Sequence, residues 1–279
     1  MQRPHTQPVL FTDLDGTLLD AETYSWDAAK PALSRLEERN IPWVVCTSKT
    51  RAELEPLRRG LGHRHPFIVE NGGAILIPEG YFTVPVSADR LAAGYRTIRI
   101  GIPYPVLRSA LKEIAKETGT VLTGFGDMDE NEIARRTGLP AAEAGLAKTR
   151  EYDEPFILEG KAQQQQAVLN RIASKGFRWT LGGRFYHLTG DNDKGRAVKI
   201  LSEIYRLQYG PIITVGLGDS LNDLPMLAAV DRPILVQMPD GSHNDAIGLP
   251  NLERVEGIGP VGWNRAVLGI LNDFPMTSP

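Results

Sequence analysis

The sequence has 279 residues, which is enough for about two domains or for one α/β unit that carries an insertion. Hydrophobic residues make up 42% and charged residues 23%, a balance that is typical of a globular protein with a sizeable core. The net charge of -3 argues against a general nucleic-acid or anionic-membrane surface, but it allows a local basic pocket for an anionic substrate.

Cys46 is the single cysteine, so the chain forms no intrachain disulfide and no zinc site built on cysteines. It lies in an apolar stretch that predicts a buried strand. Neither an apolar signal region nor an apolar run of about 18 residues is present. We therefore expect a cytoplasmic protein with no membrane or nucleic-acid partner, and the sequence leaves its oligomeric state open.

The first and last thirds of the chain alternate strands and helices. The predicted strands are 9–12, 41–47, 66–77, 211–219 and 232–238, and the predicted helices are 25–40, 48–62, 194–210, 220–230 and 263–274. Apolar strands joined by helical crossovers indicate a doubly wound, parallel-sheet α/β core with helices on both faces. This core is assigned to residues 1–89 and 190–279.

The middle of the chain, residues 90–189, has a different pattern. Helices are predicted at 105–119, 129–138, 140–151 and 162–176, and strands at 95–102, 155–159, 178–183 and 184–190. Paired strands near glycine turns favour an antiparallel sheet with helices on one face. We interpret this segment as an α+β domain inserted into the core.

Asp13 and Asp15 stand two positions apart at the end of the first predicted strand. If the strand runs through both, their side chains point the same way and repel, unless a cation or a shared proton lies between them. Oxygen ligands favour Mg²⁺. A surface turn is the simpler alternative, whereas a calcium loop fits poorly because Gly16 comes too early for its pattern.

Two further segments favour the metal interpretation. Asp219 and Asp223 follow another buried strand, and Thr47 ends a third, so all lie at the sheet edge where α/β proteins bind ligands. Lys194 opens a helix, where a lysine and the helix N-terminus both attract phosphate, although most lysines are simply solvated. Leu221 stands where a dinucleotide fingerprint needs its third glycine, which argues against that alternative.

Together, "DLDGT" (13–17), "VVCTS" with Thr47, Lys194 before a helix, and "GLGDSLND" (216–223) resemble the four motifs of the haloacid dehalogenase superfamily of phosphohydrolases. The resemblance covers the whole chain, because the inserted domain is similar to that superfamily's large α+β cap. The segments "TSKTRAE", "VENGGA", "REYDEPF" and "GGRFYHL" resemble its mannosyl-3-phosphoglycerate phosphatase branch. Enzymes acting on glucosyl-3-phosphoglycerate or other sugar phosphates share much of this pattern.

The resemblance implies roles for the strand-end residues. Asp13 would be the nucleophile that forms an aspartyl-phosphate, and Asp15 would move the proton of the leaving group and then of water. Mg²⁺ would be held by Asp13, the main-chain oxygen of Asp15 and Asp219, with Asp223 binding it directly or through water. Thr47 and Lys194 would hold the phosphoryl oxygens.

The inserted cap is expected to supply specificity. Arg150 and Arg184 are candidates for the substrate carboxylate, and Lys49 could help from the core, although each could instead be a structural ion-pair residue. His187 is a candidate for sugar hydroxyls or a satisfied strand histidine. Two further residues are predicted near the site: Asn71 shapes the pocket or a turn, and Asn222 positions Lys194 or a metal-bound water. Cap closure would exclude water from the reaction.

The sequence therefore predicts a Mg²⁺-dependent phosphatase that hydrolyses mannosyl-3-phosphoglycerate through an aspartyl-phosphate. The alternatives are a glucosyl-3-phosphoglycerate or other sugar-phosphate phosphatase, a sugar phosphomutase that uses the same aspartates, and a non-catalytic sensor of metal and phosphate.

Overall fold

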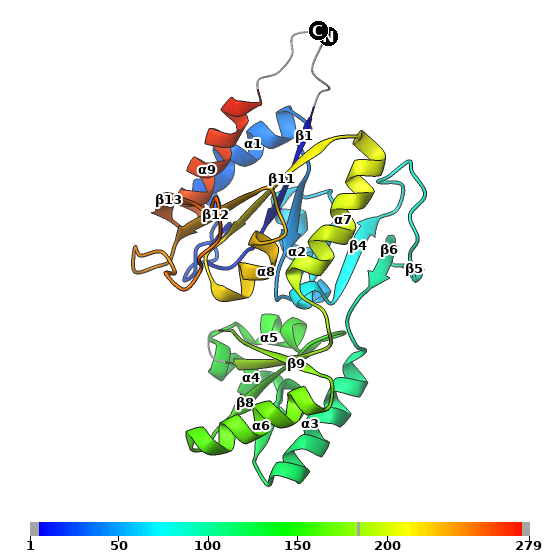
Figure 1. Cartoon of the computed structure of the whole chain (residues 1–279), viewed down its shortest axis with the longest axis vertical. Coiled ribbons are helices and arrows are strands. Elements are labelled where there is room, and N and C mark those ends of the chain that lie inside the picture. The colour runs from blue at the N-terminus through cyan, green and yellow to red at the C-terminus, as the bar shows by residue number, and fades with distance from the viewer. Residues whose placement is uncertain (1–5, 183–184, 275–279) are drawn as a thin grey trace.

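The computed structural model describes residues 6–182 and 185–274, which form a large α/β core and a smaller α+β cap (Figure 1). The chain crosses between the two parts twice, through loops near residues 100 and 190. No helix within residues 6–182 and 185–274 is long and apolar enough to cross a bilayer.

A nine-stranded sheet forms the centre of the core, in the order β13-β12-β11-β1-β2-β3-β4-β6-β5. Its strands are β1 (Gln7–Thr12), β2 (Trp43–Cys46), β3 (Phe67–Val69), β4 (Ala74–Pro78), β5 (Arg90–Ala92), β6 (Tyr95–Arg99), β11 (Ile212–Gly218), β12 (Arg232–Gln237) and β13 (Glu253–Ile258). β1 pairs in parallel with β11 on one side and β2 on the other. The predicted doubly wound α/β core is confirmed.

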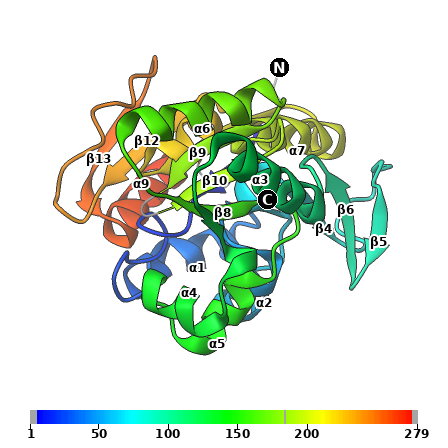
Figure 2. The ribbon, with the colours of Figure 1, turned by 90° about the horizontal axis from the view of Figure 1, so that it is seen from below.

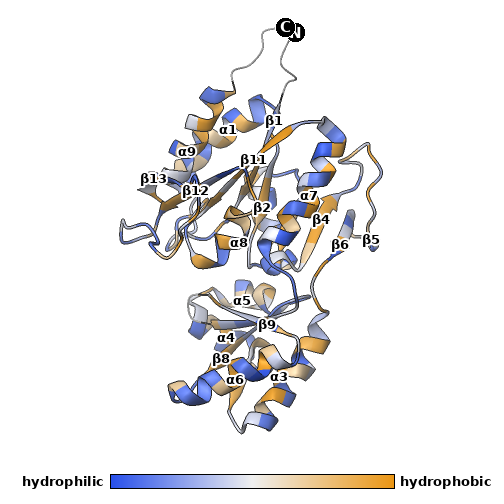
Figure 3. Cartoon of the chain, in the orientation of Figure 1, coloured by the Kyte–Doolittle hydropathy of each residue, from blue (hydrophilic) through white to orange (hydrophobic). Residues whose placement is uncertain are grey.

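Helices cover both faces of this sheet. One face packs against η1 (Asp27–Ala29), α1 (Lys30–Glu38), α2 (Arg51–Leu61) and α9 (Pro260–Asp273), and the other against α7 (Lys194–Tyr209) and α8 (Leu224–Leu227). The central strands are therefore apolar on both sides, as the hydropathy colouring shows (Figure 3). Cys46 is buried, as predicted.

One edge of the sheet differs from the parallel arrangement that the sequence predicts. β4 pairs antiparallel with β3, β6 pairs antiparallel with β4, and β5 pairs antiparallel with β6. These strands extend the sheet to one side of the molecule (Figure 2). Residues 90–99 therefore belong to the core sheet, and the predicted cap boundary at residue 90 is too early.

The cap is a four-stranded antiparallel sheet in the order β7-β8-β10-β9. It contains β7 (Leu122–Gly124), β8 (Glu154–Leu158), β9 (Arg178–Gly182), β10 (Phe185–Thr189), α3 (Tyr104–Thr118), η3 (Phe125–Asp127), α4 (Glu130–Thr137), α5 (Ala141–Lys148) and α6 (Ala162–Ser174). Helices α3 and α6 pack on one face of this sheet. α4 and α5 pack beside part of the other face, against Ile157 and Phe185.

The helix predicted at 220–230 is shorter than expected. Residues Leu221–Asp223 form the 3-10 turn η4, and only Leu224–Leu227 are α-helical. The reason is local: the Asp223 carboxylate accepts hydrogen bonds from the backbone N–H groups of Asp219 and Ser220, which holds the turn in its own conformation.

Candidate functional site

The carboxyl ends of the central strands bring the predicted acidic residues together. Asp13 follows β1, Thr47 follows β2 and Asp219 follows β11, and these three strands are neighbours in the sheet. Lys194 is the first residue of α7, whose N-cap is Asp193. Segments that are far apart in the chain therefore converge at one sheet edge, as expected for an open α/β fold.

A buried ion cluster lies at this edge. The Lys194 ammonium is 2.7 Å from Oδ1 of Asp13 and 2.6 Å from Oδ1 of Asp223, and its side chain is 1% exposed. Burial alone would lower the pKa of Lys194, but the two carboxylates raise it. Lys194 is therefore a fixed positive charge against Asp13.

The three aspartates of this cluster could hold a metal ion. One carboxylate oxygen from each of Asp13, Asp219 and Asp223 lies within 4.8 Å of the others. Burial and the charge of Asp223 raise the pKa of Asp13 well above its ordinary value, and the same causes raise that of Asp219 to about 7. One ammonium does not neutralise three buried carboxylates, so the donor set fits a hard divalent cation such as Mg²⁺.

Neighbouring residues hold Asp219 in place. The Thr17 hydroxyl donates to Oδ1 of Asp219 at 2.8 Å. Gly16 has a φ of +79°, and a Cβ at this position would approach Oδ2 of Asp219 to 2.9 Å. The glycine of "DLDG" is thus required both for its backbone conformation and for room beside the acidic cluster.

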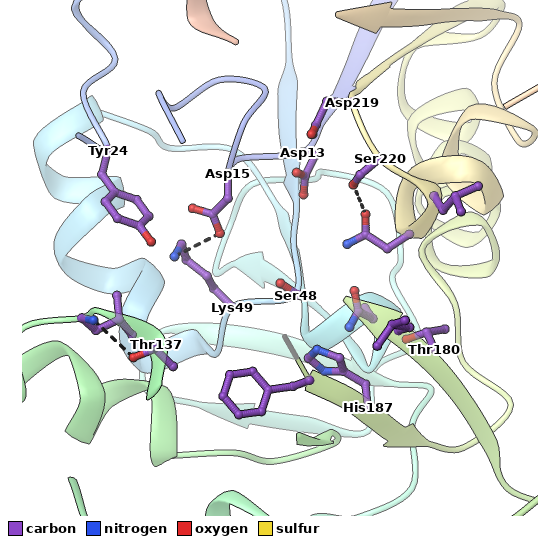
Figure 4. A pocket seen from close by; sticks show the side chains of 16 residues that line it. Asp13, Asp15, Tyr24, Ser48, Lys49, Thr137, Thr180, His187, Asp219 and Ser220 are labelled. Carbon is purple, nitrogen blue, oxygen red and sulfur yellow. Dashed lines mark hydrogen bonds and ion pairs between the residues drawn. The ribbon is translucent and has the colours of Figure 1, made fainter. Parts of the chain in front are cut away.

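Asp15 lies apart from the three-aspartate cluster and faces Lys49 (Figure 4). Their charged atoms are 3.1 Å apart, and the Lys49 ammonium lies 5.0 Å from the centre of the Tyr24 ring. Strand β1 ends at Thr12, so Asp13 and Asp15 belong to a loop and not to a regular strand. The two carboxylates consequently have different partners: Lys194 for Asp13 and Lys49 for Asp15.

A cavity of about 450 Å³ opens between these residues and the cap. Core and cap both contribute to its wall, as Figure 4 shows. Its described lining consists of Asp13, Asp15, Tyr24, Ser48, Lys49, Asn71, Thr137, Leu139, Thr180, Leu181, Phe185, His187, Asp219, Ser220, Leu221 and Asn222. The inserted domain therefore faces the strand-end aspartates across a space large enough for a small ligand.

Four predicted residues are absent from this described lining: Lys194 and Asp223, which belong to the buried ion cluster, and Thr47 and Arg150. Thr47 is fully buried, and its hydroxyl accepts a hydrogen bond from the Lys49 N–H, while the neighbouring Ser48 lines the cavity. Arg150 donates to the main-chain oxygens of Ser48 and Ala147 and is absent from the described lining. In this structure Arg150 ties the cap to the loop after β2. Arg184 lies outside the described residues.

Four of the predicted substrate-binding residues line the cavity: Lys49, described above, and three others. His187 lies on β10 of the cap, Asn71 lies in the turn η2 (Glu70–Gly72), and Asn222 lies in η4. The amide oxygen of Asn222 accepts from the Ser220 hydroxyl. One of the two predictions for Asn222 was that it positions Lys194. In the structure Asp223, and not Asn222, contacts the Lys194 ammonium.

Sequence reasoning missed several residues that shape the site. Tyr24 lies in the loop after β1 beyond any motif, and Thr17 ends the "DLDGT" motif but was given no role. Asp153 is fully buried and bonds to both Asn71 and His187, but in the sequence it is one acid among many charges. The contact with His187 depends on the antiparallel pairing of β8 with β10, in which Pro155 lies opposite His187, and the local sequence does not show this pairing.

Comparison with known proteins assigns the class. Residues 10–89 match the haloacid dehalogenase-like hydrolases. A protein of Methanococcoides burtonii is 51% identical over 263 residues, covering 94% of this chain and 97% of its own. The chain therefore belongs to the haloacid dehalogenase-like hydrolase family, and it is a phosphoric monoester hydrolase.

The names of similar proteins are more specific than this class, because they include a substrate. The Methanococcoides burtonii protein is named glucosyl-3-phosphoglycerate/mannosyl-3-phosphoglycerate phosphatase. A Pyrococcus horikoshii protein named mannosyl-3-phosphoglycerate phosphatase is 38% identical, covering 82% of this chain and 90% of its own. Among solved structures, a phosphatase of the same superfamily from Bacteroides thetaiotaomicron aligns with a TM-score of 0.67 at 18% identity, covering 98% and 97% of the two chains. That likeness shows the fold.

Proposed function

We propose that this protein is a Mg²⁺-dependent phosphatase that hydrolyses mannosyl-3-phosphoglycerate to mannosylglycerate and phosphate. The observation that carries the reaction is the buried cluster of Asp13, Lys194, Asp219 and Asp223, which opens onto a cavity closed by the cap. The names of relatives that are similar over most of the chain support the substrate.

In the first step, a carboxylate oxygen of Asp13 attacks phosphorus. The bond between phosphorus and the glycerate oxygen breaks, and Asp15 gives its proton to that oxygen as it leaves. Lys194 supports the attack because its charge favours the ionised form of Asp13. Asp13 then carries the phosphoryl group as an aspartyl-phosphate.

In the second step, water attacks the phosphorus of this intermediate. Asp15, now ionised, takes a proton from the water, and the bond from phosphorus to Asp13 breaks to release phosphate. The ammonium of Lys49, 3.1 Å from Asp15, is placed to stabilise the ionised form between the two steps. Each aspartate returns to its starting state.

Asp13, Asp219 and Asp223 would hold Mg²⁺, with the main-chain oxygen of Asp15 as the further ligand that the family pattern predicts. The ion would offset the repulsion between the anionic nucleophile and the anionic phosphate. Lys194 lies at the same sheet edge, and we assign it to the phosphoryl oxygens as the sequence predicts. Thr47 is buried behind Ser48, and its hydroxyl would support the loop after β2 by accepting from the Lys49 N–H.

Glucosyl-3-phosphoglycerate is the second candidate substrate. The relatives from Methanococcoides burtonii and Persephonella marina, 51% and 44% identical, carry both sugars in their names. We therefore expect activity on both glycosyl phosphoglycerates. A cytoplasmic location, as predicted from the sequence, completes the proposal.

Phosphate release by the purified protein with Mg²⁺ tests this function. The substrates are mannosyl-3-phosphoglycerate, glucosyl-3-phosphoglycerate, 3-phosphoglycerate and p-nitrophenyl phosphate, and the Asp13→Asn variant is the blank. We expect a glycosyl phosphoglycerate to have the highest kcat/KM and the blank to be inactive. If phosphate is released from p-nitrophenyl phosphate alone, the proposed glycosyl phosphoglycerate substrate is wrong. Transfer of phosphate between sugars without release would favour a phosphomutase.

A further inference from the structure

Asp153 forms a buried junction between the cap and the core. It lies just before β8, and its side chain is 0% exposed. Its carboxylate oxygens are 2.9 and 3.0 Å from Nδ1 of His187 on the cap, and Oδ2 is 3.1 Å from Nδ2 of Asn71 on the core. Arg150 lies 3.8 Å away and supplies the nearest full positive charge.

The charge of Asp153 fixes how its neighbours are oriented. Although burial raises its pKa, His187 and Arg150 outweigh burial and hold the pKa of Asp153 below its ordinary value. An ionised carboxylate only accepts hydrogen bonds, so Nδ1 of His187 must carry a hydrogen and the amide nitrogen of Asn71 must face Asp153. The opposite atoms, Nε2 of His187 and Oδ1 of Asn71, are left for other partners.

Both residues line the cavity, and Asn71 is 8% exposed. Within the described part of the chain, Oδ1 of Asn71 is buried without a hydrogen-bond partner. A buried acceptor without a donor is costly, so the site is incomplete until a donor arrives. With Nδ1–H donated to Asp153, Nε2 is the ring atom of His187 that is left for a ligand: it accepts when the ring is neutral and donates when the ring is protonated.

We propose that Asp153 is a positioning residue that presents Asn71 Oδ1, an acceptor, and His187 Nε2 to the hydroxyl groups of the sugar, which can both donate and accept. This inference rests on the proposed function and deepens it. The carboxylate of the substrate offers no hydrogen at neutral pH, so the buried acceptor Oδ1 of Asn71 disfavours the anionic end of the substrate here. The anionic end is left to the side of the cavity where Lys49 lies, and the sugar faces β10 (Figure 4).

The test compares substrates with and without a sugar. His187→Phe keeps a ring and removes both nitrogens, and Asp153→Asn places an amide where only acceptors fit. We expect each variant to raise KM for the glycosyl phosphoglycerate about tenfold, with kcat changed by about twofold or less. Activity on 3-phosphoglycerate and p-nitrophenyl phosphate should stay within about twofold of the wild type.

Tyr186→Phe is the matched control, because Tyr186 precedes His187 on β10 and packs into the opposite, helix-covered side of the cap. It should leave all substrates unchanged. Equal losses on every substrate, or no loss on the glycosyl substrate, would overturn the inference. If Asp153→Asn lowers the melting temperature, its kinetic effect could reflect unfolding, and the test then depends on His187→Phe.

The wild-type measurements separate this inference from the proposed function. If the wild type prefers a different sugar phosphate, the proposed substrate is wrong, and the same variants are compared on the preferred sugar. A KM effect confined to that sugar would still support the role of Asp153. If the wild type favours no sugar phosphate over p-nitrophenyl phosphate, both proposals fall.

Discussion

At the scale of single residues, the site depends on one lysine. Lys194 is enclosed between Asp13 and Asp223, and these contacts are the described ion pairs of its ammonium. Removing one partner from a buried ion pair costs more than the pair itself contributes, because the remaining charge is left without compensation.

We therefore expect Lys194→Met to reduce phosphate release by at least about a hundredfold and to lower the free energy of unfolding by about 3 kcal/mol. Urea unfolding and a phosphate-release assay measure the two effects. Lys199→Met is the control, since Lys199 is an exposed residue of the same helix α7. A variant that keeps full activity would show that Lys194 has no part in the reaction.

Asp219 gives a second prediction, about metal and pH. Its pKa is about 7 without a metal ion, so a proton competes with Mg²⁺ for this carboxylate below that pH. We expect the apparent Mg²⁺ affinity to rise between pH 6 and pH 8, and chelation with EDTA to abolish activity. Calorimetric titration across this range measures the change. Asp219→Asn should weaken Mg²⁺ binding and flatten the pH dependence; an unchanged slope would contradict the assignment.

At the scale of elements, the short segment 70–73 joins the core to the cap. Glu70 and Asn71 have positive φ values of 48° and 54°, and Gly72 has one of 84°. The Gly73 oxygen accepts hydrogen bonds from the N–H groups of Ile100 and Gly101, on the first crossing between the domains. The Asn192 side chain, on the second crossing, donates to the main-chain oxygen of Asn71.

Gly72→Ala tests this segment. Its Cβ would lie 2.1 Å from the Asp193 main-chain oxygen, directly before Lys194, so the start of α7 must shift. We expect a loss of about 2–5 kcal/mol in unfolding free energy, from the left-handed backbone and the overlap together, and a lower kcat. Gly80→Ala has a similar φ of 76° with nothing within 4 Å, so it should cost about 1–2 kcal/mol and leave kcat unchanged. Equal effects of the two variants would refute the steric argument.

The elements that the sequence predicts well are those with a strong apolar pattern. β1, β2, β11 and the helix α7 follow from such runs, so the sequence also predicts the sheet edge at which the acidic cluster lies. β13 was not predicted, because only Val255 of its residues is buried and the strand lies at a sheet edge. Contacts between distant segments, such as Asp153 with Asn71, depend on how the cap docks, and no local pattern encodes that docking.

The same limit applies to the predicted roles of two residues. A motif predicts that its polar side chains face the ligand, but Thr47 lies behind Ser48, and Arg150 donates a hydrogen bond to the Ser48 main-chain oxygen. Sequence gives the type and approximate place of a group. Which atoms reach the cavity is decided by packing at the junction of core and cap.

At the scale of the whole molecule, the position of the cap depends on a buried carboxylate. Both oxygens of Glu70 accept from the Glu151 N–H, at 3.0 and 3.1 Å, and Oε2 also accepts from the Tyr152 N–H at 2.8 Å. Arg150 and Thr50 add core–cap contacts next to it, to the Ser48 and Leu146 oxygens respectively. Glu70 is fully buried, and burial raises its pKa from 4.5 to about 7.

This shift makes stability depend on pH in a definite direction. Between pH 4.5 and 7 the folded protein holds a proton on Glu70 that the unfolded chain has released, so the stabilisation is present below pH 4.5 and is lost as pH rises through 7. The shift corresponds to about 3 kcal/mol at most. Since the Glu70 carboxyl group links the core to the cap, we expect this loss of stability to weaken the packing of the cap against the core.

Glu70→Gln removes this titration and tests the argument. The amide stays neutral, so the variant should lose about 1 kcal/mol at pH 5, where one hydrogen bond is weakened, and equal or exceed the wild type at pH 8. Urea unfolding at both pH values, with the difference taken between variant and wild type, cancels every other titrating group. Glu256→Gln, whose side chain is 86% exposed, should show no such difference. A Glu70→Gln variant that is destabilised equally at pH 5 and pH 8 would mean that Glu70 is already ionised in the folded protein and that hydrogen bonding outweighs burial.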